Sequence, residues 1–160
     1  MTNLTRPSDL DDFDLAILET VCASNLPSHG AIGAEVGLSA SAVRRRLSRL
    51  RREGFIVGDV ALVDPERFGL SFAVHVAFER EDLEAIRAFE ASVREEPAVS
   101  QGYSISGDYD FLLIVHAVSP SAFEQWGRRT LMANPMVKRY SSSVIWSRTK
   151  FSARFRPAIG

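Results

Sequence analysis

The run from Ser39 to Arg52 is the stretch of this sequence with the clearest chemical consequence. It contains six arginines and no acidic residue. An ordinary solvated helix would alternate glutamate with arginine to form pairs four residues apart, whereas like charges at this density repel one another unless an anion lies alongside. Nucleic acid is the natural partner for such a surface. The run therefore predicts contact with a nucleic acid.

The same run is predicted to form one helix of about four turns. Ser39 is a good N-cap, because its hydroxyl can accept a hydrogen bond from an unpaired amide of the first turn, and Gly54 permits the left-handed conformation that ends a helix. An apolar stripe consists of Val43, Leu47 and Leu50. The opposite stripe consists of Ser41, Arg45, Ser48 and Arg52. We expect the first stripe to pack and the second to face the partner.

The candidate DNA-binding residues are Ser39, Ser41, Arg44, Arg45, Arg46, Ser48, Arg49 and Arg52. Those expected to reach base edges are Ser41, Arg45 and Ser48, with Arg44 intermediate. Arg49 and Arg52 are expected at phosphates, which position a protein without reading sequence. Arg46 is expected either at a phosphate or in an ion pair with the protein's own acids, and both interpretations stay open.

Two shorter helices are predicted before the basic one. Apolar residues recur at helical spacing from Asp9 or Asp11 onward, and the aspartates of the first turn favour the positive end of the helix dipole. The 24–27 segment breaks this pattern, and Ser28 can cap a second helix that ends before Gly37. Three helices joined by short turns, with the third one basic, are typical of a helix-turn-helix module.

The second half of the chain alternates strands with helices. Residues 55–63 have strand composition and are expected to form a linker strand. Beyond them we expect strands at 71–78, 98–105, 109–118 and 137–146, and helices at 82–95 and 120–133. This β-α-β-β-α-β order is that of a ferredoxin-like α+β fold, in which both helices cover one face of an antiparallel sheet.

The two strands richest in apolar residues lie at 72–78 and 111–115, and they are apolar on both faces. A sheet with helices on one side only would show one polar face. We therefore expect the second face to be covered as well, most economically by the same sheet of a second copy in a twofold dimer. A dimer would also present two basic helices to two half-sites about one DNA turn apart.

Composition limits the other functions. The 160 residues are 46% apolar with a formal net charge of -1, which fits one large or two small domains and excludes a polybasic coat. Cys22 is the only cysteine, so neither a disulfide framework nor a cysteine zinc site is available, and a reduced cytoplasm fits. We expect no metal, because no residues stand at metal-ligand spacing. We expect no cofactor and no catalytic residues, because the sequence has neither a nucleotide-binding loop nor a nucleophile elbow. We expect no membrane anchor, because no apolar run approaches the ~20 residues that span a bilayer.

Taken together, the order and spacing of these features resemble the Lrp/AsnC family of bacterial and archaeal transcription regulators, from about Leu10 to Lys150. The residues that carry the resemblance are Leu10-Asp11, Asp14, Ile17-Leu18, Gly37-Leu38-Ser39, Val43, Arg45-Arg46-Leu47, Gly54-Phe55-Ile56, Asp64-Pro65, Gly69, Ser106-Gly107-Asp108-Tyr109-Asp110, Pro135, Val137 and Lys150. The resemblance implies a winged-type helix-turn-helix domain at 1–54 and a linker strand at 55–68. It also implies a ligand-sensing and oligomerisation (RAM) domain at 69–150 and a tail at 151–160.

The partners that the resemblance implies are double-stranded DNA, further copies of the chain in dimers and larger homo-oligomers, and a small-molecule effector, commonly an amino acid bound between dimers. The candidate effector residues are Ser106, Gly107, Asp108, Tyr109, Asp110 and Ser142. Asp110 is the first candidate acceptor for a ligand ammonium. Considered without the resemblance, 107–110 is equally a plain turn between strands. The identity of the effector stays open, because family members frequently have Thr where Ser106 and Ser142 stand.

Two other functions stay open on this architecture. Sirohaem decarboxylases share it, but they tend to carry a histidine-containing segment where this chain has Ser106 to Asp110. The second is a ligand-binding module that has lost DNA binding. The Ser39 cap and the arginines after it favour a DNA-binding regulator over both.

Overall fold

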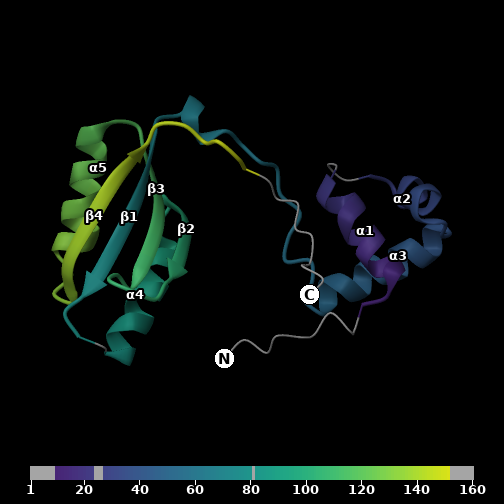
Figure 1. The fold of residues 1–160 in the computed structure, drawn as a ribbon, viewed down its shortest axis with the longest axis horizontal. Helices are drawn as coiled ribbons and strands as arrows, with labels where there is room; N and C mark the ends of the chain where they lie inside the picture. The colour runs from purple at the N-terminus through teal and green to yellow at the C-terminus, as the bar shows by residue number, and fades with distance from the viewer. Residues whose placement is uncertain (1–9, 24–26, 81, 152–160) are drawn as a thin grey trace. The chain divides into compact units, whose positions relative to one another are not determined.

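The computed structural model describes residues 10–23, 27–80 and 82–151. The chain divides into two compact units, one that runs to Leu62 and includes Lys150 and Phe151, and one of residues Val63–Thr149 (Figure 1). The polar N-terminus, residues 24–26 of the expected interhelical break, and residues 152–160 of the expected tail lie outside the described residues. Each unit is described by itself.

The first unit contains three helices, α1 (Asp12–Ala23), α2 (His29–Val36) and α3 (Ala40–Arg52). Each begins at a side-chain cap. At α1 the cap is reciprocal, because the Asp14 N–H donates to Asp11 Oδ1 at 2.9 Å and the Asp11 N–H donates to Asp14 Oδ2 at 3.2 Å. Ser28 and Ser39 cap α2 and α3 through the N–H groups of Ala31 and Ala42. The predicted starts of α2 and α3 are therefore confirmed.

The turn between α2 and α3 is tight. Gly37 has a φ of 74°, which only glycine adopts at no steric cost. A Cβ on Gly33 would collide with the carbonyl oxygen of Leu38, so a second glycine allows the two helices to approach. The apolar side chains of the three helices meet in one buried cluster of Ile17, Ile32, Val43, Leu47 and Leu50. The helix-turn-helix prediction is confirmed.

The segment after α3 differs from the expectation. Gly54 has a φ of 80° and ends the helix region as predicted, but residues 56–64 form no strand. Val57 is 98% exposed and Val60 is 78% exposed. A strand exists only when its backbone groups pair with a neighbouring strand, and the single described chain provides none here. The prediction of a linker strand at 55–63 is therefore wrong for the isolated chain.

The second unit begins with a short 3-10 helix over Pro65–Arg67 and continues as one antiparallel sheet packed with longer helices. The strands are β1 (Leu70–Phe78), β2 (Val99–Ser104), β3 (Phe111–Ala117) and β4 (Val137–Ile145), in the order β2-β3-β1-β4. The helices are α4 (Leu83–Glu95) and α5 (Pro120–Gly127). Where a single helix was expected to Ala133, α5 instead passes into a π-helical turn over Arg128–Met132. The predicted β-α-β-β-α-β order is confirmed.

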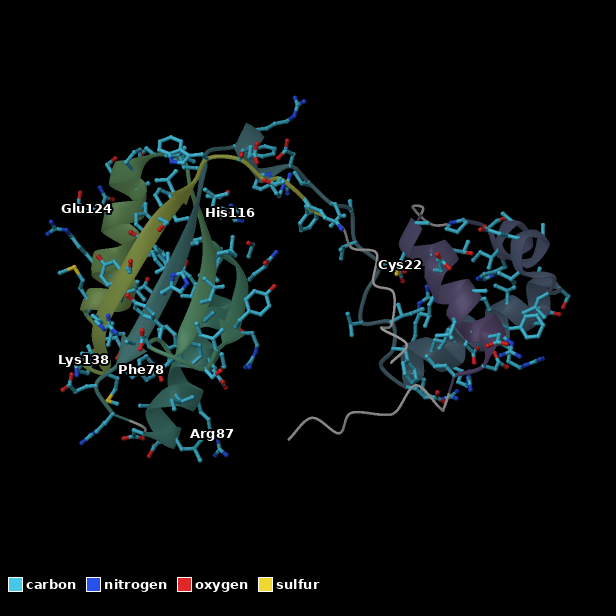
Figure 2. The ribbon with its side chains drawn as sticks, viewed as in Figure 1. Cys22, Phe78, Arg87, His116, Glu124 and Lys138 are labelled. Atoms are coloured by element: carbon cyan, nitrogen blue, oxygen red, sulfur yellow. The ribbon has the colours of Figure 1, made fainter. Side chains whose placement is uncertain are left out.

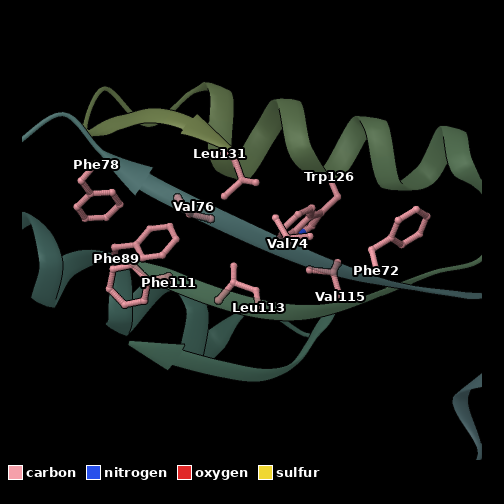
Figure 3. Close-up of a cluster of buried hydrophobic side chains, with 10 residues drawn as sticks. All are labelled: Phe72, Val74, Val76, Phe78, Phe89, Phe111, Leu113, Val115, Trp126 and Leu131. Carbon is pink, nitrogen blue, oxygen red and sulfur yellow. The ribbon is translucent and has the colours of Figure 1, made fainter. Parts of the chain in front are cut away.

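The core of this unit lies on one face of the sheet. Phe72, Val74 and Val76 of β1 alternate toward it, and Figure 3 shows them with side chains of β3, α4 and α5. The helical contributions are Phe89, Trp126 and Leu131. The opposite face carries Ala73, His75, Leu112 and Ile114, which are only half-buried. Both helices thus pack on one face, as predicted.

Candidate nucleic-acid interface and effector site

Helix α3 divides its arginines between two sides. Arg44, Arg45, Arg51 and Arg52 are exposed, together with Ser41 and Ser48. Arg46 and Arg49 are half-buried. Both flank the buried stripe, because Leu50 lies four residues after Arg46 and directly after Arg49. The exposed residues form the outer face of α3, and the name is kept for that set below.

The first turn of α1 binds the two half-buried arginines. Arg46 Nη1 donates to Asp11 Oδ2 at 2.8 Å and to Asp14 Oδ1 at 2.9 Å. Arg49 Nη2 donates to Asp14 Oδ2. The expectation that Arg49 contacts a phosphate differs from the structure, in which Arg49 pairs with Asp14 because its position on the helix directs it toward α1. Arg46 follows the second of its two open interpretations, an ion pair with the protein's own acids.

Electrostatics keep this network fully charged. Burial acts to raise the pKa of Asp14, but hydrogen bonds from Arg49 and Arg46 outweigh burial and hold that pKa below its ordinary value. The same hydrogen bonds raise the pKa of Arg46 and of Arg49. Two guanidinium groups therefore face the carboxylates of Asp11 and Asp14, and their charges cancel.

Sequence reasoning missed this role of the two aspartates. They stood out only as carboxylates at a helix N-terminus, and their arginine partners lie 32 to 35 residues further along the chain. Only the packing of α1 on α3 brings them together. The sequence also missed Asp59, which accepts a hydrogen bond from Arg51 Nη2 at 3.0 Å.

The outer face of α3 has the chemistry to recognise DNA. Ser39 is used in the cap, and its Oγ lies 3.1 Å from Ser41 Oγ. Arg52 is 72% exposed although its Nη2 lies 3.5 Å from Glu53. Exposed guanidinium groups can bind guanine edges in two-pronged fashion or bind phosphates, and hydroxyls can bind either.

In the second unit the hairpin between β2 and β3 contains five of the candidate effector residues, 106–110. Gly107 has a φ of 127°, which supports the tight reversal. Asp110 ties the hairpin to β1, because its N–H donates to Val76 O at 2.9 Å and its Oδ2 accepts from the Phe78 N–H at 2.7 Å. The carboxylate predicted to accept a ligand ammonium therefore already binds the backbone through one oxygen.

Arg139 of β4 lies against this hairpin. Its Nη2 donates to the carbonyl oxygen of Asp108 at 3.0 Å, its Nη1 donates to Tyr109 Oη at 3.3 Å, and its guanidinium lies 4.6 Å from the centre of the Tyr109 ring. The His75 ring lies 5.3 Å from the same aromatic ring. From the sequence, His75 is expected only as a core or interface histidine and Arg139 is not singled out, because cross-strand contacts cannot be read without the register.

Ser142 lies on the other face of the sheet. It pairs with Val74, whose side chain is in the core, so Ser142 shares the helix-covered face. His75 and the residues paired with it share the opposite face. Within one chain the structure therefore does not bring Ser142 to Tyr109.

His116 lies on β3, where it is labelled in Figure 2, and both of its ring nitrogens are hydrogen-bonded to serine hydroxyls. Nδ1 lies 2.9 Å from Ser71 Oγ, and Nε2 lies 2.7 Å from Ser100 Oγ. Burial, and next the charge of Arg148, lower the pKa of His116.

In the part of the chain that the structure describes, no group of acidic, histidine or cysteine side chains is arranged to bind a metal ion, and no helix could span a bilayer.

Comparisons with known proteins match both units. Residues 10–57 match the model of a winged helix-turn-helix DNA-binding domain, and residues 71–155 match that of the Lrp/AsnC ligand binding domain. The two models together define a class of protein that combines a DNA-binding domain with a ligand sensor. The chain belongs to the Lrp/AsnC family of transcriptional regulators.

Individual relatives match this chain over nearly its whole length. An uncharacterized HTH-type transcriptional regulator of Sinorhizobium fredii is 36% identical over 89% of this chain and 85% of its own. The leucine-responsive regulatory protein of Salmonella typhimurium is 31% identical over 93% of both chains. The crystal structure of a Neisseria meningitidis transcriptional regulator in complex with L-Met is 28% identical, covers 91% of this chain and 96% of its own, and superposes with a TM-score of 0.83.

Proposed function

We propose that this regulator is a dimer that reads DNA through the outer face of α3 and changes its assembly when it binds an amino acid. The single observation that carries the DNA-binding part is the partition of α3, which leaves Arg44, Arg45 and two serines exposed on one side. Such a face fits the major groove, where side chains discriminate base pairs.

In this proposal five of the six outer residues contact DNA, and the sixth, Arg51, pairs with Asp59. Ser41, Arg45 and Ser48 contact base edges, and Arg45 is the residue placed to bind guanine with two hydrogen bonds. Arg44 is intermediate between base and phosphate contact, and Arg52 contacts phosphate. Arg46 and Arg49 remain bound to Asp14 and contribute to the fold of the domain.

The dimer uses the second face of the sheet. Ala73, His75, Leu112 and Ile114 lie there, and an antiparallel sheet whose second face is rich in apolar side chains is stabilised when another apolar surface covers it. A second copy of the same face provides that surface and gives the twofold symmetry expected of a homodimer. Two α3 helices can then read two half-sites about 34 Å apart.

For the effector, the hairpin and Arg139 provide suitable chemistry. A guanidinium can bind the carboxylate of an amino acid, and the Tyr109 ring can pack on its side chain. The relatives support this class of ligand, because one is solved with L-Met and another is named for its response to leucine. Ser106 lies in the same hairpin as Tyr109, whereas Ser142 belongs to the site only if a second chain brings the two sheet faces together. A coupling of about 1 to 3 kcal/mol between effector and DNA would suffice for regulation.

We propose no enzymatic activity. The curated relatives carry the names of regulators, and the hairpin has no histidine where sirohaem decarboxylases tend to carry one. The exposed arginines of α3 also argue against a ligand-binding module without DNA binding. The proposed place of action is the cytoplasm.

A fluorescence-anisotropy titration tests the proposal. The labelled duplex is the DNA upstream of the protein's own gene, with an unlabelled scrambled duplex as competitor, at two salt concentrations. We expect binding that resists the competitor, weakens steeply with salt and changes when one of the twenty amino acids is added. Absence of binding to any duplex at low salt would contradict the proposal and favour the ligand-binding or enzymatic alternatives.

A further inference from the structure

Asp14 is the centre of the contacts between α1 and α3. Its side chain is only 1% exposed, yet it is charged and binds three groups: the N–H of Asp11, the guanidinium of Arg46 and that of Arg49. The side chains of Arg46 and Arg49 are 24% and 33% exposed, against 72% for Arg52 on the outer face. Asp11 adds a second carboxylate to Arg46 from the rim of the network.

Leaving this network is unfavourable for either arginine. A guanidinium that moved to a phosphate would leave the buried Asp14 carboxylate with one partner fewer, and a buried charge that loses a hydrogen-bonded partner is strongly destabilised. The phosphate would bring no comparable gain, because the arginine is already paired with an anion. Arg46 and Arg49 are therefore expected to stay on α1 when DNA is bound.

The number of arginines available to DNA affects the specificity of DNA binding as well as its affinity. Contacts to phosphates supply nearly all of the binding to non-specific DNA, since they do not depend on sequence. Each additional arginine that reached a phosphate would strengthen binding to every duplex. More of the protein would then be bound to non-specific DNA in competition with the operator.

We propose that Asp14 is a positioning residue that sets DNA specificity: it holds Arg46 and Arg49 on the inner side of α3 and so limits the phosphate contacts that this helix makes. Asp11 assists by binding Arg46 alone. The inference rests on DNA binding by α3 and names the residues that regulate the specificity of that binding.

The salt dependence of binding to a scrambled duplex tests this proposal, because its slope counts phosphate contacts and a purely structural role of Asp14 would not steepen it. Wild type is compared with Asp14→Asn, Asp11→Asn and Asp12→Asn. The third is the matched control, since Asp12 is exposed in the same helical turn and its variant changes the net charge by the same amount. Asparagine also remains a good N-cap at position 11.

We expect the slope of log K against log salt to steepen by about 0.9 for each arginine released in each bound chain, and so by up to about 1.8 in Asp14→Asn. In Asp11→Asn the slope should steepen by less than about 0.9, because Arg46 keeps its hydrogen bond to the buried Asp14. The Asp12→Asn variant should show the wild-type slope. Equal slopes in all four proteins, with circular dichroism showing that Asp14→Asn is folded, would overturn the proposal.

A second set of variants tests the proposal even if Asp14→Asn does not fold. Arg46→Gln and Arg49→Gln should have the wild-type slope of log K against log salt. In Arg52→Gln the slope should become shallower by about 0.9, because one phosphate contact is lost. A slope that is shallower by about 0.9 in Arg46→Gln or in Arg49→Gln would show that the replaced arginine contacts phosphate, and would overturn the proposal. If the wild-type protein bound no duplex, the proposed function would fail instead, so the two failures are distinguishable.

Discussion

In the first unit the candidate DNA-binding side chains lie along one helix, while in the second unit the candidate effector residues lie on two faces of a sheet. Helix α3 is oriented by ion pairs and apolar contacts from its own chain, so its outer face is complete in a single copy. Ser142 and Tyr109 are separated by the sheet between them. Within one chain, the exposed side chains of α3 therefore share one face, whereas the candidate effector residues are divided between two faces of the sheet.

Truncating a core leucine in one unit should give the largest change in the free energy of unfolding. The same variant tests whether the two units are stabilised by separate cores. Leu50→Ala removes a side chain that is 0% exposed between the three helices, and we expect it to lower the free energy of unfolding of the first unit by about 2 to 5 kcal/mol. Hydrogen exchange should then accelerate in α1 to α3 and remain unchanged in the sheet. Leu131→Ala, on the core of the second unit, should give the reverse pattern, and acceleration in both units for either variant would contradict separate cores.

A charge on the second face of the sheet tests whether that face forms the dimer. Ile114→Asp places a carboxylate opposite Ala73, where two copies would bury it. We expect the dimer dissociation constant from analytical ultracentrifugation to rise by at least about tenfold, equivalent to about 1.4 kcal/mol. Leu83→Asp on the exposed start of α4 is the matched control, and similar dissociation in both variants would argue against this face.

Asp110 sharpens the comparison, because its carboxylate has a structural role already within one chain. Asp110→Ala leaves the Phe78 N–H without its acceptor, and we expect a loss of about 1 to 3 kcal/mol in the free energy of unfolding. Asp108→Ala, at an exposed position of the same hairpin, should change it by less than about 0.5 kcal/mol. Chemical denaturation measures both, and equal effects would show that the bond to β1 contributes little.

The smallest effect is the pH dependence of the first unit. Because hydrogen bonds lower the pKa of Asp14 in the folded protein, its contribution to stability is complete above the unfolded value of about 3.9 and is lost as the pH falls through the lower folded value. We expect Asp14→Asn to flatten the fall in stability below about pH 4, by at most about 1.4 kcal/mol per pH unit. Denaturation at a series of pH values measures the slope, and parallel curves would contradict the lowered pKa.

Local signals predicted most of the fold. Ser39 and Gly54 bracket α3 because a cap and a left-handed glycine act within one turn of the helix, and the alternation in β1 follows from neighbouring residues. Residues 56–64 failed as a strand because strand formation depends on a partner rather than on composition.

Long-range contacts explain what could not be predicted of the sites. The sequence supplied the set of arginines on α3 but could not divide it, since the division depends on where α1 packs. The contact of Asp110 with Phe78 and that of Arg139 with Tyr109 depend on the strand order in the same way. The sequence thus predicted which residues could act, and tertiary packing decided which of them remain exposed to a partner.

Two adjacent residues of α3 provide the most direct test of the central claim, that the outer face reads DNA and the inner face does not. The measurement is the ratio of affinities for the upstream duplex and the scrambled duplex, in Arg45→Ala and in Arg46→Ala. We expect Arg45→Ala to lower this ratio by about tenfold, within the range of about 1 to 3 kcal/mol for a lost base contact. We expect Arg46→Ala to leave the ratio near its wild-type value. A larger fall of the ratio in Arg46→Ala than in Arg45→Ala would contradict this division of α3 into an outer and an inner face.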